Sequence, residues 1–199
     1  MTKQFQIIRT ETAYAGFFRM EKYWLKHTLY NGGWSEEICR ELFIRGRCVA
    51  VLLYDPQADK VVLIEQFRIG ALLQPERAWL LEIVAGAIEE GETAEQVAYR
   101  ESLEEAGCEI QELKQISEFF TTPGGAAEKI TLFCGKIDSS QVGGIHGLAE
   151  EGEDILVRTV DFADAYAMLA TGEIDSAIPI IAIQWLALHR EQLKQQWCA

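Results

Sequence analysis

The amino-acid sequence predicts an α+β protein, in which strands dominate and three helices accompany them. Short apolar or alternating runs bounded by turn residues indicate strands, and segments whose apolar residues recur every three to four positions indicate helices. We expect two extended segments within 15–45, and strands at Cys48–Tyr54, Val61–Phe67, Trp79–Val84, Glu118–Thr122, Ile130–Ile137 and Ile155–Val160. We expect helices at 93–106, around 161–171 and at 176–194.

Turn residues group the first strands into two hairpins. Asn31-Gly32-Gly33, within 15–45, can supply the positive φ angles of a hairpin connection. Asp55-Pro56 separates the next two apolar runs and predicts a second hairpin. We therefore expect a small N-terminal β subdomain, residues 1–45, ahead of a main domain, residues 46–199.

The charge balance excludes several classes of partner. The chain carries 31 acidic and 18 basic residues, a formal net charge of −13. Such a surface repels nucleic acid and anionic lipid, so we expect neither as a partner, whereas an anionic small molecule can bind where metal cations mediate. The apolar run Cys48–Tyr54 is far shorter than the roughly 20 residues of a membrane span, and the N-terminus lacks a secretory signal. We expect a cytoplasmic protein.

The cysteines indicate ordinary packing residues. They are five in number, widely spaced and without a C-x-x-C pair, and the chain has only three histidines. Neither a disulfide framework nor a zinc site is expected from this pattern.

The segment 86–108 contains a well-delimited helix with an acidic face. Thr93 and Gln96 suit a capping box, and Gly107 suits a helix stop. Between them, Glu101, Glu104 and Glu105 fall within an arc of about 100° on one face. Like charges at this spacing destabilise a bare helix, and oxygen-preferring divalent cations would offset the repulsion. The alternative is a solvated acidic face.

The same segment resembles the Nudix box, G-x5-E-x7-R-E-U-x-E-E-x-G-U, in which U is a bulky apolar residue. The matching positions are Gly86, Glu92, Arg100, Glu101, Glu104, Glu105 and Gly107. Each residue type fills about one position in fifteen on average, so chance agreement at all of them is about one window in 10⁸. Ser102, where the box prefers an aliphatic residue, departs from the pattern, and Cys108 is a modest occupant of its last apolar position.

The resemblance implies a mixed sheet sandwiched between helices and the hydrolysis of a nucleoside diphosphate linked to another group. It implies Mg²⁺ as the cofactor, with Mn²⁺ as an alternative, and Glu101, Glu105 and the carbonyl of Ala85 as ligands. The supporting positions that the resemblance implies, which hold the loop and the acidic face, are Gly86, Glu92, Arg100 and Glu104.

Two flanking segments are similar to the ADP-ribose pyrophosphatase branch of this family. Phe120-Thr-Thr-Pro-Gly-Gly125 carries a proline associated with that branch, although a simple turn would also explain it. The loop at Glu150–Glu153 resembles the branch's catalytic loop, which implies Glu151 as the general base and Glu153 as a further metal ligand. A plain acidic surface loop is the alternative.

The resemblance runs from Ile7 to Trp197. In the family, the N-terminal β segment is exchanged between two subunits and completes the partner's substrate site. By position, Phe17 is implied to stack on adenine, Arg40 and Arg68 to hold the nucleotide and its phosphates, and Glu128 to contact the substrate. Alternatively, Phe17 could be a core residue and Arg68 a surface ion-pair partner.

These observations together favour a homodimeric, magnesium-dependent enzyme that cleaves ADP-ribose to AMP and ribose 5-phosphate. A Nudix hydrolase of another nucleotide sugar, such as GDP-mannose, is the first alternative. A non-catalytic Nudix module that senses ADP-ribose is the second. A silent module should lack box carboxylates, and none is missing here.

Overall fold

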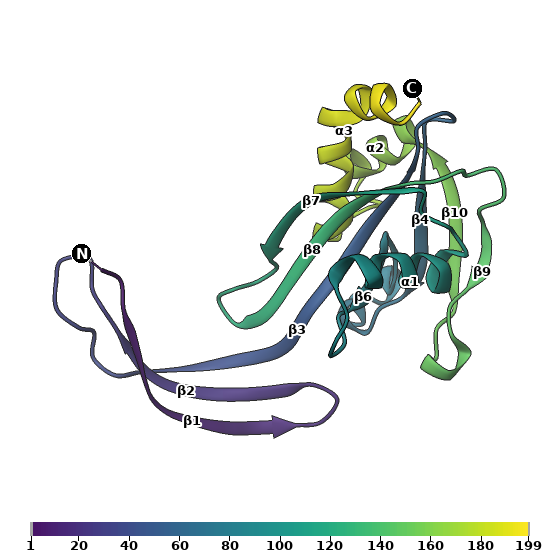
Figure 1. The fold of residues 1–199 in the computed structure, drawn as a ribbon. Helices are drawn as coiled ribbons and strands as arrows, with labels where there is room; N and C mark the ends of the chain where they lie inside the picture. The colour runs from purple at the N-terminus through teal and green to yellow at the C-terminus, as the bar shows by residue number, and fades with distance from the viewer. Residues whose placement is uncertain (1, 199) are drawn as a thin grey trace. The chain divides into compact units, whose positions relative to one another are not determined.

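A computed structural model describes residues 2–198 of the chain. By their contacts, the residues form two compact units, Met1–Arg47 with Phe120–Lys129, and Cys48–Phe119 with Ile130–Ala199 (Figure 1). The strand β3 (Ile38–Asp55) contributes its first part to the N-terminal unit and its second part to the larger unit.

The N-terminal unit is built on an antiparallel arrangement of β1 (Phe5–Ala15), β2 (Arg19–His27) and the first part of β3. The predicted turn lies between β2 and β3, where the Leu29 amide donates to the Gly33 carbonyl at 3.0 Å and Gly33 has a φ of 78°. The two extended segments are therefore confirmed. The strand β1 was not predicted, because all its residues are exposed and no buried face leaves an alternating pattern.

The larger unit is built around a sheet in which the second part of β3 pairs with β4, β6 and β8. The strand β4 also pairs antiparallel with β5 and β10, and β10 pairs with β9. The bounds of these strands are β4 Lys60–Phe67, β5 Trp79–Glu82, β6 Val84–Ala87, β7 Glu112–Phe120, β8 Ala126–Lys136, β9 Gly144–His146 and β10 Ile155–Asp161. The expected strand at Trp79–Val84 is thus two strands with a break at Ile83, and the one expected at Glu118–Thr122 is the end of the longer β7.

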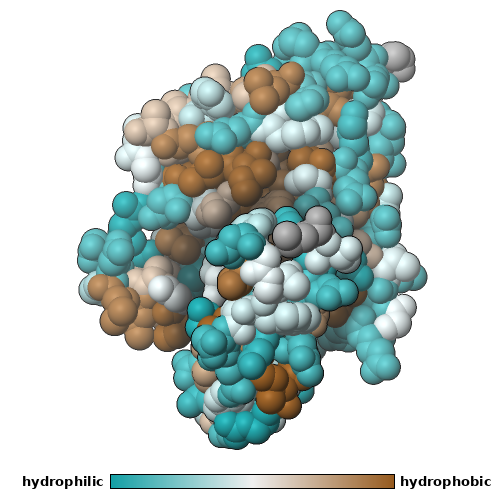
Figure 2. Space-filling model, turned by 90° about the vertical axis from the view of Figure 1, so that its left-hand side faces the viewer, coloured by the Kyte–Doolittle hydropathy of each residue, from teal (hydrophilic) through white to brown (hydrophobic). Residues whose placement is uncertain are grey.

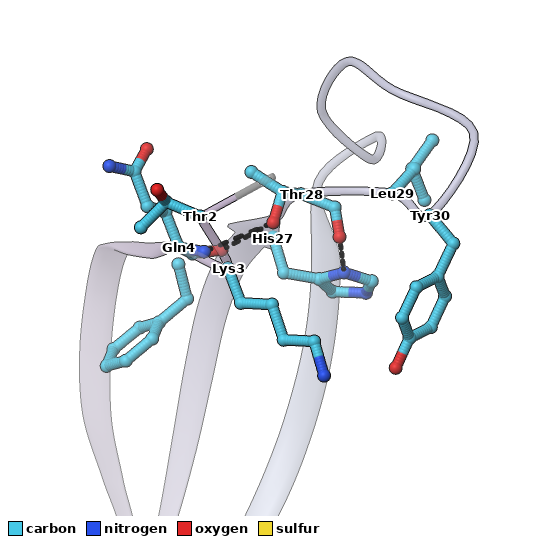
Figure 3. Close-up of a pocket in the computed structure, with 8 residues that line it drawn as sticks. Thr2, Lys3, Gln4, His27, Thr28, Leu29 and Tyr30 are labelled. Atoms are coloured by element: carbon cyan, nitrogen blue, oxygen red, sulfur yellow. Dashed lines mark hydrogen bonds between the residues drawn. The ribbon is translucent and has the colours of Figure 1, made fainter.

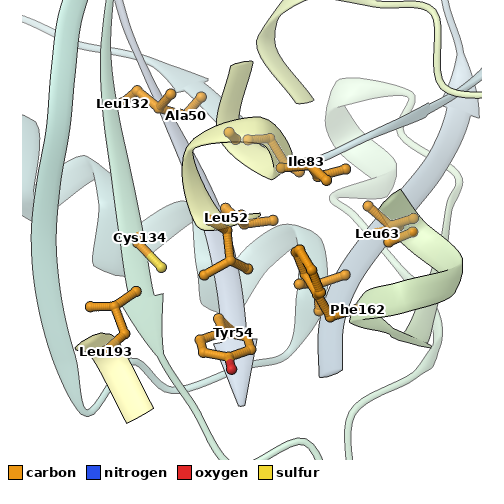
Figure 4. Packing of buried hydrophobic residues seen from close by; sticks show 14 of the residues in the cluster. Ala50, Leu52, Tyr54, Leu63, Ile83, Leu132, Cys134, Phe162 and Leu193 are labelled. Carbon is orange, nitrogen blue, oxygen red and sulfur yellow. The ribbon is translucent and has the colours of Figure 1, made fainter. Parts of the chain in front are cut away.

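Helices cover both faces of this sheet. The α-helices of residues 2–198 are α1 (Ala94–Ala106), α2 (Phe162–Thr171) and α3 (Ala177–Trp197), close to the predicted ranges. Successive side chains of β3 point to opposite faces of the sheet and pack into two different cores. Val51 packs in a cluster with α1, whereas Leu52 packs with α2 and α3 (Figure 4). The predicted fold, a mixed sheet sandwiched between helices, is confirmed.

Local chemistry explains where α1 begins and ends. The Thr93 hydroxyl accepts from the Gln96 amide at 3.2 Å, the Gln96 side chain accepts from the Thr93 amide at 2.8 Å, and Gly107 adopts φ 60° at the C-cap. Ser102, the departure from the box pattern, is fully buried and donates its hydroxyl to the Ala98 carbonyl at 2.7 Å. The hydroxyl is therefore satisfied within the helix, so the substitution leaves no unpaired polar group.

The described part of the chain also contains short 3₁₀ helices at Ile69–Ala71, Pro75–Arg77 and Ala149–Glu151. All five cysteines carry free thiols. Across residues 2–198, no helix combines the length and the apolar character that crossing a membrane would require.

Candidate active site

The acidic face of α1 is turned partly into the protein. The side chain of Glu105 is only 2% exposed, and its Oε2 accepts a hydrogen bond from the Ala85 amide at 2.9 Å. Burial raises the pKa of Glu105 to about 8, while the bond from Ala85 opposes the rise. The alternative of a fully solvated acidic face is therefore wrong for this helix.

Arg100 links the acidic residues of the box. Its guanidinium contacts Glu101 at 2.7 Å, Glu104 at 2.9 Å and Glu92 at 3.1 Å. The hydrogen bond from Arg100 also holds the pKa of Glu92 below its usual range. These contacts join Arg100 to Glu92 and Glu104, for which the resemblance implied a supporting role.

Glu101 occupies space that only a glycine at position 86 leaves free. A Cβ added to Gly86 would lie 1.8 Å from Glu101 Oε1. Burial raises the pKa of Glu101 to about 7, against the opposing effect of Arg100. The box glycine thus allows a carboxylate of α1 to lie directly against β6.

Glu153 lies close enough to these carboxylates to interact with them electrostatically. Its negative charge contributes to the raised pKa values of both Glu101 and Glu105. Its Oε2 accepts from the Leu148 amide at 3.0 Å, which fixes the side chain against its own loop. We refer to Glu101, Glu105 and Glu153 as the acidic cluster.

The segment before Glu153 is more ordered than a plain loop. Glu151 ends a 3₁₀ turn that starts at Ala149, and Gly152 closes it at φ 72°. The side chains of Glu150 and Glu151 are both exposed. The candidate base Glu151 therefore stands on an exposed turn, two residues before a member of the acidic cluster.

Arg68 serves as an ion-pair partner and also affects the acidic cluster. Its Nε contacts Glu82 Oε2 at 2.6 Å, and its positive charge lowers the pKa of Glu105. Glu82 was not among the predicted site residues. Its signal in the sequence was a lone carboxylate within the apolar run of β5 and β6, and it lies opposite Ile64 on β4.

The chemistry of the acidic cluster fits a divalent cation that prefers oxygen. Carboxylates and backbone carbonyls are the ligands of Mg²⁺, and the set contains no sulfur or imidazole that would favour a softer metal. Within residues 2–198, no three His, Cys, Asp or Glu side chains already converge as a ligand set. Instead, each member of the cluster accepts a hydrogen bond from a protein donor: Glu101 from Arg100, Glu105 from Ala85 and Glu153 from Leu148.

The other predicted substrate residues lie in the N-terminal unit. Phe17 is 95% exposed, so the alternative of a core residue is wrong, and its ring meets the edge of Phe18 at 4.8 Å between centroids. Arg40 donates to the Cys39 carbonyl at 2.8 Å. Glu128 contacts Arg45 at 2.9 Å and accepts from the Thr121 hydroxyl at 2.8 Å.

A cavity of about 640 Å³ lies in the N-terminal unit, between the start of the chain and the end of β2 (Figure 3). Thr2–Phe5 and His27–Tyr30 line it, and the Lys3 ammonium lies 5.4 Å from the centre of the Tyr30 ring. The Thr28 hydroxyl accepts from the Gln4 amide at 3.1 Å. None of the predicted site residues lines this cavity.

Comparison with known proteins shows the family of the chain. Residues 44–179 match the family model of the NUDIX domain. The chain is 47% identical to an ADP-ribose pyrophosphatase of Escherichia coli (strain K12), covering 96% of this chain and 92% of the relative. It is equally similar to an ADP-ribose pyrophosphatase of Haemophilus influenzae (47%, covering 96% and 90%), and 30% identical to a GDP-mannose pyrophosphatase of Escherichia coli (strain SMS-3-5), covering 94% and 96%.

A solved structure supports the fold independently. The crystal structure of an ADP compounds hydrolase superposes with a TM-score of 0.70, at 20% identity, and covers 98% of this chain and 97% of that one. At this identity the likeness concerns the fold, while the family assignment comes from the domain match and the relatives. With a matching domain over most of its length and relatives at 47% identity, the chain belongs to the Nudix family.

Proposed function

We propose that this protein is a magnesium-dependent hydrolase that cleaves the diphosphate of ADP-ribose, giving AMP and ribose 5-phosphate. In this reaction, water adds to one phosphorus and the phosphoanhydride P–O bond breaks. The observation that carries the proposal is the partly buried acidic cluster, which an intact Nudix helix and the loop before β10 form together. The choice of ADP-ribose rests on the relatives at 47% identity, which are ADP-ribose pyrophosphatases.

We propose the following roles for the residues of the larger unit. Glu101, Glu105 and Glu153, together with the carbonyl of Ala85, would hold Mg²⁺, with Mn²⁺ as a substitute. When bound, such an ion polarises phosphoryl oxygens and acidifies water. Glu151, on its exposed turn, would accept the proton of the attacking water.

Positive charge near the acidic cluster supports binding of a diphosphate. A diphosphate is anionic, and the chain as a whole is strongly acidic, so a local cation is required. Arg68 acts electrostatically on Glu105, and among residues 2–198 its ion pair is with Glu82. We propose that its remaining guanidinium N–H groups bind the substrate's phosphates.

We further propose that the active protein is a homodimer, in which the N-terminal segment of one subunit supplies Phe17 and Arg40 to the other, and that Glu128 contacts the substrate. Hydrophobic side chains interrupt the hydrophilic surface in Figure 2. In the N-terminal unit, Phe5, Tyr14 and Phe17 are exposed, and no described residue of this unit belongs to either core cluster. An exposed apolar surface of this kind is typical of an interface between subunits.

A substrate panel tests the proposed function directly. Purified protein is assayed with ADP-ribose, GDP-mannose and other nucleoside diphosphate sugars, each with Mg²⁺ and with EDTA, and the products are resolved by chromatography. We expect the highest kcat/KM with ADP-ribose and no turnover in EDTA. A preference for GDP-mannose would show that GDP-mannose, and not ADP-ribose, is the substrate. Binding of ADP-ribose without turnover would identify a non-catalytic module.

A further inference from the structure

Gln66 on β4 is a buried amide without a hydrogen-bond partner. Its side chain is 5% exposed, and Nε2 is the sole buried side-chain nitrogen or oxygen of residues 2–198 that lacks a partner. Buried donors are almost always paired, because water no longer solvates them. An exception therefore needs an explanation, and a change that accompanies ligand binding can supply the missing partner.

The position of Gln66 on its strand places it beside the acidic cluster. Side chains alternate along a strand, so Ile64, Gln66 and Arg68 share one face of β4. Ile64 packs in the core cluster under α1, and Arg68, whose backbone is still extended, interacts electrostatically with Glu105 of α1. Gln66 thus lies between the apolar core under α1 and the charged residues at its edge.

The β5 residue directly opposite Gln66 offers the amide no side-chain acceptor. The residue paired with Gln66 on β5 is Leu80, which has an apolar side chain. The acceptors known on this face are carboxylates: Glu82, which is engaged by Arg68, and Glu105, of which one oxygen is engaged by Ala85. An ionised carboxylate is an acceptor with about four lone-pair sites, so it can take a further donor while it also binds a cation.

We propose that Gln66 is a positioning residue for the acidic cluster, and that its Nε2 donates to a carboxylate oxygen of the cluster when a divalent cation is bound. The amide would then fix the orientation of the carboxylate that binds the cation, as hydrogen-bonding partners of metal ligands commonly do. This inference rests on the metal dependence of the proposed function and not on the identity of its substrate.

Magnesium titration of the melting temperature, without substrate, tests this role. The variant Gln66→Met keeps the length of the side chain and removes the donor, and Gln66→Leu is a second variant of similar size. In EDTA, we expect both variants to melt at or above the wild-type temperature, because an unpaired buried donor has been removed. We expect the Mg²⁺ concentration that gives half of the stabilising shift to rise about tenfold, since the loaded cluster loses a charge-assisted hydrogen bond.

The matched control is Ile64→Val, two residues earlier on the same face of β4. It removes one methylene from the core, so the melting temperature should fall in EDTA while the magnesium midpoint stays unchanged. The inference is overturned if Gln66→Met and Gln66→Leu also leave the midpoint unchanged, or if the wild type shows no magnesium-dependent shift.

The outcomes for Gln66 and for the substrate are separable. If the wild type cleaves ADP-ribose but the midpoint does not move in the Gln66 variants, the inference fails and the proposed function stands. If the midpoint moves but ADP-ribose is not cleaved, the inference stands and the substrate is wrong.

Discussion

The Ala85 amide donates a hydrogen bond to Glu105 Oε2 across 2.9 Å, and this contact joins β6 to α1 at two residues for which we propose a metal-binding role. The residue before the box glycine and the last glutamate of the box are thus in direct contact. The strand therefore orients a carboxylate that burial alone would leave protonated near neutral pH.

Replacing Glu105 by glutamine should separate metal binding from folding. The amide oxygen of Glu105→Gln can still accept from Ala85, but one ligand charge is lost, so we expect kcat to fall about 100-fold or more. The melting temperature in EDTA should not decrease, because a buried carboxylate is removed. The control is Glu95→Gln, an exposed residue in the first turn of α1, which should leave kcat unchanged. Steady-state kinetics at saturating Mg²⁺ measure both variants, and wild-type activity of Glu105→Gln would rule out its role as a ligand.

The pH dependence of stability should reflect the same carboxylate. Its folded pKa of about 8 lies above the ordinary value of 4.5, so the folded state retains a proton that the unfolded state loses. This contribution to stability is complete below about pH 4.5 and is lost as the pH rises toward 8. In EDTA, the melting temperature should therefore fall between pH 6 and about 9, and Glu105→Gln should weaken that fall. Circular dichroism melts of both proteins test this, and parallel curves would contradict the assignment.

The helix α1 could be predicted because its determinants are local in sequence. Its capping box, its left-handed C-cap at Gly107 and its acidic face all lie within one short segment. The strand β1 could not be predicted, because none of its residues is buried and so no alternation marks it. Propensity and pattern detect a strand mainly through the face that it buries.

The residues of the candidate site that belong to a sequence motif could be predicted. The contacts that join distant segments of the chain could not. The resemblance identified Arg68 and Glu128, but not their partners Glu82 and Arg45. Those pairs depend on which strands lie side by side, and the spacing of charges in the sequence does not encode that. The unpaired amide of Gln66 is likewise visible only once burial is known.

A methyl group at Gly86 should displace Glu101. In Gly86→Ala, the new Cβ would lie 1.8 Å from Glu101 Oε1, and the flexible carboxylate can move more easily than β6. We expect a melting temperature close to that of the wild type in EDTA, with a magnesium midpoint at least about tenfold higher, because a ligand is displaced. Gly70→Ala is the control, since a Cβ there meets nothing within 4 Å. Unchanged magnesium affinity in Gly86→Ala would show that Glu101 is not a ligand.

The assembly prediction concerns the exposed apolar residues of the N-terminal unit. Sedimentation equilibrium of the full chain should give twice the mass of one chain, and deletion of residues 1–45 should give a monomer. Phe17→Ala changes the residue proposed to stack on adenine, so it should raise KM for ADP-ribose by about tenfold or more. A full-length monomer with ordinary activity would refute the exchanged segment.

The general base should be identified by comparing three neighbouring glutamates. Glu150 and Glu151 are both exposed on the 3₁₀ turn. Glu153 is partly buried, and its negative charge contributes to the raised pKa values of Glu101 and Glu105. A carboxylate that binds a cation is a poor base, because the ion suppresses its basicity, so Glu153 is better suited to hold metal than to accept a proton.

The three Glu→Gln variants should therefore differ in kind. A general base contributes about 10²–10⁴-fold, so Glu151→Gln should lower kcat by at least two orders of magnitude, with ADP-ribose and Mg²⁺ still bound. Glu153→Gln should mainly raise the Mg²⁺ concentration needed for activity, and Glu150→Gln should match the wild type. Steady-state kinetics over a series of Mg²⁺ concentrations rank the three variants by kcat and by magnesium requirement. Calorimetry measures whether Glu151→Gln still binds ADP-ribose. If Glu151→Gln retains more than about a tenth of the wild-type kcat, it falls outside the range of a general base and the proton must go elsewhere.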